Sequence, residues 1–162
     1  MSKIEQRLAV RKRKGKIMER CINSYKEIIA FAIGHEIKAY RLYVDLSKRM
    51  VSSKTRELCK KLAKEERRHI ARLEKESARK CQLISPVNFS RYDIAYGKIN
   101  IFANRLSMLS FAIKKEKAAV QLYRDLTELT RNEEARQLFM WLAQEELRHQ
   151  RQVGLEYNNC LK

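Results

Sequence analysis

Glycine and proline are scarce in this sequence, whose 162 residues contain 4 Gly and 1 Pro. Average usage would give about 19 of the two together. Hairpins, bulges and tight turns depend on them, so a many-stranded sheet is nearly excluded. A few long helices with few connections fit best. No run of 18 apolar residues occurs, so we expect no membrane span. Residues 1–16 lack the apolar stretch of a secretory signal.

Closely spaced cysteine pairs are also lacking. The four cysteines are Cys21, Cys59, Cys81 and Cys160, and no two of them form a CxxC pair. This spacing excludes a rubredoxin-type or zinc-ribbon site. We expect reduced thiols and a cytoplasmic location.

Acidic residues are outnumbered by basic ones, with 36 Lys and Arg against 19 Asp and Glu and a net charge of +17. Residues 1–16 are predicted to form a basic N-terminal arm that precedes a bundle domain over residues 17–162. The arm contains the basic run Arg11-Lys12-Arg13-Lys14, which suggests nucleic acid or another anionic surface as a partner. No aromatic residue is interleaved with this run, which argues against specific recognition of single strands.

An internal repeat with an offset of 80 residues organises the chain. Residues 31–69 align without a gap with residues 111–149, and 17 of the 39 positions are identical. Each copy reads as two amphipathic helices, because apolar residues recur at spacings of three and four. The first helix is predicted over about 17–50, with Ile22 on its apolar stripe, and the third helix repeats that stripe from Phe102.

Short breaks separate the helices within each copy. Ser52 or Ser53 is predicted to cap the second helix, and Asn132 the fourth, which begins at Glu133. The one longer stretch without helical periodicity, residues 82–97, is predicted to be the crossover between the halves. We therefore predict an all-α protein: an antiparallel four-helix bundle of the ferritin-like type with one long crossover, built from a duplicated helical hairpin.

Six polar residues stand on the apolar stripes. Four buried carboxylates would be costly without compensation, and two divalent cations would compensate them. Each half supplies a Glu from one helix and a Glu-x-x-His from the next, which is the arrangement of di-iron and di-manganese carboxylate proteins. The predicted metal ligands are Glu36, Glu66, His69, Glu116, Glu146 and His149, and iron or manganese suits them, with zinc as a further option.

Several neighbouring residues allow two interpretations. Tyr43 and Tyr123 either pack in the core or donate hydrogen bonds to ligand carboxylates, of their own or of the opposite half, and supply protons. Glu65 and Glu145 are either rim residues or ligands. His35 is placed at the surface or just outside the ligands, and Glu76 and Glu156 at the wet end of the bundle.

Each half contains a Glu…Tyr pair followed by a Glu-x-x-His motif. The pairs and motifs are Glu36…Tyr43 with Glu66-x-x-His69, and Glu116…Tyr123 with Glu146-x-x-His149. Together they resemble the rubrerythrin branch of the ferritin-like superfamily. The resemblance covers about residues 18–158. It implies a non-haem di-iron site bridged by Glu66 and Glu146, with the other four residues as terminal ligands. It further implies reaction with hydrogen peroxide or dioxygen, an electron donor such as rubredoxin, and a homodimer.

Two departures from the family pattern bear on function. The chain ends at Lys162 without a rubredoxin domain, so we expect the electron donor to be a separate protein. The additional glutamate of rubrerythrins is replaced by Ala119 or Ile113. The leading hypothesis is thus a di-iron oxidoreductase of the peroxidase or oxidase type. The alternatives are an iron-binding or iron-oxidising protein without rapid turnover, and a nucleic-acid-binding protein that uses the basic arm.

Overall fold

The computed structural model describes residues 21–22, 24–77, 87–88, 92 and 104–162. They form four long helices, α2 (Tyr25–Arg49), α3 (Ser53–Glu76), α4 (Arg105–Leu129) and α5 (Glu133–Asn159), with two short strands, β1 (Cys21–Ile22) and β2 (Val87–Asn88). β1 pairs antiparallel with β2. The predicted all-α class is confirmed. The arm at 1–16 and most of the predicted crossover at 82–97 lie outside the described residues.

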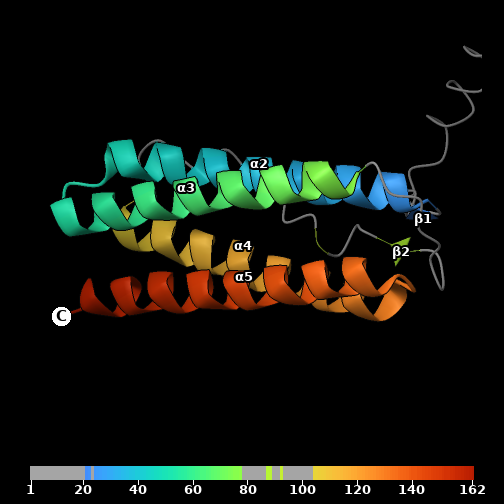
Figure 1. Cartoon of the computed structure of the whole chain (residues 1–162). Helices are drawn as coiled ribbons and strands as arrows, with labels where there is room; N and C mark the ends of the chain where they lie inside the picture. Colours follow the sequence, from blue (N-terminus) through green and yellow to red (C-terminus); the bar gives the residue numbers. More distant parts are fainter. Residues whose placement is uncertain (1–20, 23, 78–86, 89–91, 93–103) are drawn as a thin grey trace, which may run out of the picture.

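Two antiparallel hairpins, α2–α3 and α4–α5, pack against each other as a four-helix bundle (Figure 1). α3 ends at the end of the bundle where α2 begins, whereas α4 begins at the opposite end. The end of α3 and the start of α4 therefore lie at opposite ends of the bundle. This is the ferritin-like connectivity that the duplicated hairpin predicts.

Each of these helices begins after a residue whose side chain caps the first turn. The caps are Ser24, Ser52, Asn104 and Asn132, and each accepts a hydrogen bond from the backbone N–H three residues on. Such a cap contributes about 1 kcal/mol. The caps are also related by the offset of 80, so corresponding helices of the two hairpins begin at equivalent positions of the repeat.

Two predicted helix starts need correction. The first helix does not run from residue 17, because Ile22 lies in β1 and the Ser24 hydroxyl caps α2 by accepting a hydrogen bond from the N–H of Glu27. The third helix, α4, begins after its cap Asn104. Phe102, which was predicted on its apolar stripe, lies outside the described residues. The predictions of Ser52 and Asn132 as caps are confirmed.

The apolar core consists of two clusters, one toward each end of the bundle. One joins the start of α2 to the end of α4 and contains Ile28, Leu122 and Phe139. The other joins the end of α2 to the start of α4 and contains Leu46, Leu62 and Leu109. Between them, every helix contributes polar residues. None of the helices that the structure describes is long and apolar enough to cross a membrane.

Candidate metal centre

The six predicted ligands lie together in the polar layer between the two apolar clusters. Glu36 comes from α2, Glu66 and His69 from α3, Glu116 from α4, and Glu146 and His149 from α5. All six side chains are at most 1% exposed. The i, i+3 spacing of each Glu-x-x-His pair directs both of its side chains to the bundle interior.

The six residues form two overlapping groups of potential metal ligands. One group is Glu36, Glu66, His69 and Glu146, and the other is Glu66, Glu116, Glu146 and His149. In each group the ligand atoms lie within 4.8 Å of one another. Because Glu66 and Glu146 belong to both groups, the arrangement suits two cations bridged by two carboxylates.

The imidazole Nδ1 atoms face the carboxylates. Nδ1 of His69 lies 2.8 Å from Glu146 Oε1 and 3.2 Å from both Glu36 Oε2 and Glu66 Oε2. Nδ1 of His149 lies 3.0 Å from Glu66 Oε1 and 3.4 Å from Glu146 Oε2. One N–H cannot satisfy several carboxylate oxygens at once, so the imidazoles compensate these charges only in part.

Several oxygen atoms of the cluster fit a cation. Both carboxylate oxygens of Glu66 and Oε1 of Glu146 are buried, and within the described part of the chain the hydrogen bonds that they share with the imidazoles are poorly directed. Buried lone pairs without a partner cost free energy, and a divalent cation would use them. Four carboxylates with two imidazoles suit iron or manganese, and zinc as well.

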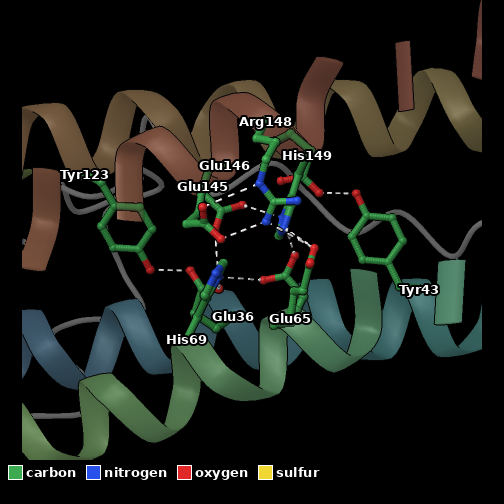
Figure 2. Close-up of polar contacts among 11 residues, drawn as sticks. Glu36, Tyr43, Glu65, His69, Tyr123, Glu145, Glu146, Arg148 and His149 are labelled. Carbon is green, nitrogen blue, oxygen red and sulfur yellow. Dashed lines mark hydrogen bonds and ion pairs between the residues drawn. The ribbon is translucent and has the colours of Figure 1, made fainter. Parts of the chain in front are cut away.

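Two tyrosines contact, from across the bundle, the two carboxylates that belong to only one ligand group each. The hydroxyl of Tyr43 on α2 donates a hydrogen bond to Glu116 on α4. The hydroxyl of Tyr123 on α4 donates to Glu36 on α2. Figure 2 shows the two phenol rings on opposite sides of the cluster. The predicted hydrogen bond to the carboxylate of the opposite half is therefore confirmed, and a catalytic role of the phenols stays a prediction.

The carboxylates differ in their protonation equilibria. Burial, with repulsion by Glu146 and Glu66, raises the pKa of Glu36 and of Glu116 well above the ordinary range. Burial acts in the same direction on Glu66 and Glu146, but hydrogen bonds from the two histidines outweigh it and lower the pKa of both. Without a metal, Glu36 and Glu116 are therefore the protonated pair.

The histidines respond to the same interactions with the opposite sign. Burial favours neutral imidazole, but hydrogen bonds to Glu146, Glu36 and Glu66 outweigh it and raise the pKa of His69 to about 12. The pKa of His149 is also raised, by hydrogen bonds to Glu146, Glu65 and Glu66 that outweigh burial. Both imidazoles are thus cationic in the metal-free protein at neutral pH.

Glu65 and Glu145 lie just outside the cluster, at the seam between α3 and α5. Nε2 of His149 lies 3.0 Å from Glu65 Oε2, which orients the ring so that Nδ1 faces inward. Arg148 joins the two carboxylates, at 3.3 Å from Glu65 and 2.7 Å from Glu145 (Figure 2). Glu145 also forms a third possible ligand group with His69 and His149. The contact with His149 makes Glu65 a partner of a candidate ligand.

Three polar residues are more buried than the sequence suggests. His35 is 4% exposed, which excludes the surface position. Glu76 and Glu156 are 7% and 6% exposed and accept hydrogen bonds from Tyr25 and Thr55, so the prediction of a wet end is wrong. The helical period identifies the face on which a residue lies but not the hydroxyl of another helix that meets it.

Sequence reasoning also missed Trp141. Its half-buried indole meets the His69 ring edge-on, with 5.3 Å between ring centroids and 87° between planes. No periodic signal marks it, because it lies beside the apolar stripe of α5 and its counterpart in the repeat is Lys61.

The duplicated hairpin, the crossover connectivity and the paired Glu-x-x-His residues define a ferritin-like four-helix bundle with a candidate two-metal carboxylate centre. The model of the Rubrerythrin family matches residues 5–79 and 95–156, and the chain belongs to this family. A hypothetical protein from Pyrococcus furiosus has a similar structure, with a TM-score of 0.65, 24% identity and coverage of 84% of this chain and 89% of that chain. At this identity the similarity supports the fold alone. A search of curated proteins gives no match.

Proposed function

We propose that the protein is a di-iron oxidoreductase that reduces hydrogen peroxide or dioxygen. The observation that carries this proposal is the pair of ligand groups that share Glu66 and Glu146. The proposed ligands are Glu36, Glu66, His69, Glu116, Glu146 and His149. When bound, two ferrous ions would supply the two electrons that convert one hydrogen peroxide and two protons to two waters, and would act as Lewis acids.

The protein would supply protons and a rigid ligand set. Burial, together with the negative charge of Glu116, raises the pKa of Tyr43, and burial with the charge of Glu36 raises that of Tyr123. Both phenols therefore remain protonated at neutral pH. We propose them as catalytic residues that hold a proton at the terminal carboxylates and deliver it while peroxide is reduced.

The test is anaerobic mixing of ferrous protein with hydrogen peroxide. We expect one peroxide to be consumed per two iron ions, far faster than by free ferrous iron. The double variant Tyr43→Phe/Tyr123→Phe should bind two metals and react more slowly, whereas Tyr40→Phe, which alters a phenol outside the cluster, should react like the wild type. Consumption no faster than by free ferrous iron would refute the enzyme proposal.

Metal analysis tests the ligands separately. Replacement of Glu66 and Glu146 by Ala should abolish binding of two metals, and retention of both ions would refute the assignment. The absence of the additional glutamate of rubrerythrins, with Ala119 at one of its candidate positions, favours slow iron oxidation as a second candidate function. The peroxide experiment separates the two. A homodimer and a cytoplasmic location stay predictions.

A further inference from the structure

Trp141 links a candidate metal ligand to the protein surface. Its indole on α5 meets the ring of His69 on α3 edge-on, with 5.3 Å between ring centroids. The guanidinium carbon of Arg72 lies 3.8 Å from the centroid of the indole ring. Arg72 is exposed and Trp141 is half-buried. A continuous set of contacts thus leads from solvent to the polar layer.

The fold itself does not require this contact. The repeat places Lys61 at the position equivalent to Trp141, and Gln152 at the position equivalent to Arg72. The aromatic and cationic pair therefore occurs beside His69 and has no equivalent beside His149. The contact with His69 therefore distinguishes one half of the polar layer from the other.

The surface around this contact is strongly basic. All nine Lys and Arg residues of α3 are exposed, and only two of its five acidic residues, Glu57 and Glu74, are exposed. We call these nine side chains the basic face of α3: Lys54, Arg56, Lys60, Lys61, Lys64, Arg67, Arg68, Arg72 and Lys75. The repeated helix α5 has three Lys or Arg and five acidic residues, so this charge also belongs to one half.

We propose that a small acidic protein carrying one electron docks on the basic face of α3 and passes its electron toward the metal pair through Trp141 and His69. Charge complementarity would guide the encounter, and the indole and imidazole rings would shorten the gap. Neither ring changes its oxidation state. Two carriers, each oxidised by one electron, supply the two electrons that convert one hydrogen peroxide and two protons to two waters.

This inference rests on the proposed redox function, so docking is measured first on the metal-free protein. The probe is an oxidised plant-type [2Fe–2S] ferredoxin, titrated calorimetrically at low salt and at about 0.2 M salt. We expect salt to weaken binding. The variant Lys64→Glu/Arg68→Glu/Arg72→Glu should bind about tenfold more weakly. The control Arg131→Glu/Arg136→Glu/Arg151→Glu changes the net charge equally on the other hairpin and should retain affinity.

Three results would overturn the docking proposal. The first is that the two triple variants bind ferredoxin with equal affinity although both give the circular dichroism spectrum of the wild type. The second is an affinity that does not depend on salt. The third is that the basic face binds duplex DNA but not ferredoxin.

The route is tested on iron-loaded protein. In anaerobic stopped-flow experiments at saturating reduced ferredoxin, Trp141→Leu should slow oxidation of the carrier several-fold without changing its Kd, and Trp141→Phe should slow it less. Reduction by dithionite should be unaffected. Carrier oxidation as fast in Trp141→Leu as in the wild type would refute the route. If dithionite-reduced wild type fails to consume peroxide, the proposed function fails instead, and the docking measurement still decides this inference.

Discussion

Loading of the cluster with two divalent cations should release about four protons near pH 7. In the metal-free protein Glu36 and Glu116 hold one proton each, because their pKa values are raised by burial and like charge. His69 and His149 are each protonated, because their pKa values are raised by hydrogen bonds to carboxylates. Metal binding requires ionised carboxylates and neutral imidazoles, so all four protons have to leave.

The expected release of four protons agrees with the charges of the six side chains. Without metal, two carboxylates and two imidazolium groups cancel. With metal, four carboxylates and two divalent cations cancel. The polar layer is thus neutral in both states, so exchange of four protons for two cations leaves no net charge between the apolar clusters. The product of the two apparent binding constants should then rise about 10⁴-fold per pH unit.

Zinc is the suitable titrant because it has no redox chemistry. Calorimetric titrations in buffers of different ionisation enthalpy should give a slope of about four protons per metal pair. Glu36→Gln cannot carry an exchangeable carboxyl proton and should release about three. Release of one proton or none by the wild type, or undiminished release by Glu36→Gln, would refute this reasoning.

Three further predictions concern stability and the surroundings of the cluster. Because the pKa values of His69 and His149 are raised above 6.5, their stabilisation of the metal-free protein is complete below pH 6.5 and declines as pH rises above it. Denaturant unfolding from pH 6.5 to 9 should show a loss of about 1.4 kcal/mol per pH unit for each retained proton, and an undiminished stability would contradict it. Glu65→Gln should weaken metal binding about tenfold by removing the carboxylate that orients His149, whereas the exposed control Glu57→Gln should leave it unchanged, a contrast that competition with a chelator measures. Gly34→Ala and Gly154→Ala, where an added Cβ meets no atom within 4 Å, should each stabilise the protein by about 0.5–1 kcal/mol, and an equal or lower midpoint in urea would contradict this.

The sequence was sufficient for the fold and the six clustered residues because both depend on periodicity. Glu66 and His69 interrupt an apolar stripe, and the offset of 80 repeats the interruption at Glu146 and His149. The seven-residue spacing from Glu36 to Tyr43, repeated from Glu116 to Tyr123, placed each phenol on the stripe near the polar layer, but it left core packing and a hydrogen bond to a carboxylate both open. Roles of these residues in catalysis stay predictions.

Contacts between helices were harder to predict, because helical period says nothing about the partner of a side chain. Glu76 was predicted to be solvated, but it is buried and accepts a hydrogen bond from the hydroxyl of Tyr25, fifty-one residues away in the sequence. Trp141 carried no signal in a repeat that aligns it with Lys61. The start of α2 was missed because Ser24 acts through one local hydrogen bond, while the apolar pattern continues upstream.

The seam between α3 and α5 makes the two halves of the cluster inequivalent. Its donor set has twofold symmetry, but His149 is backed by the Glu65 carboxylate and Arg148, whereas His69 faces the edge of an indole. A carboxylate behind an imidazole increases its donor strength and lowers the reduction potential of an ion bound to it. Two iron ions held here would therefore give two distinct Mössbauer doublets, and the ion on His69 would be reduced first.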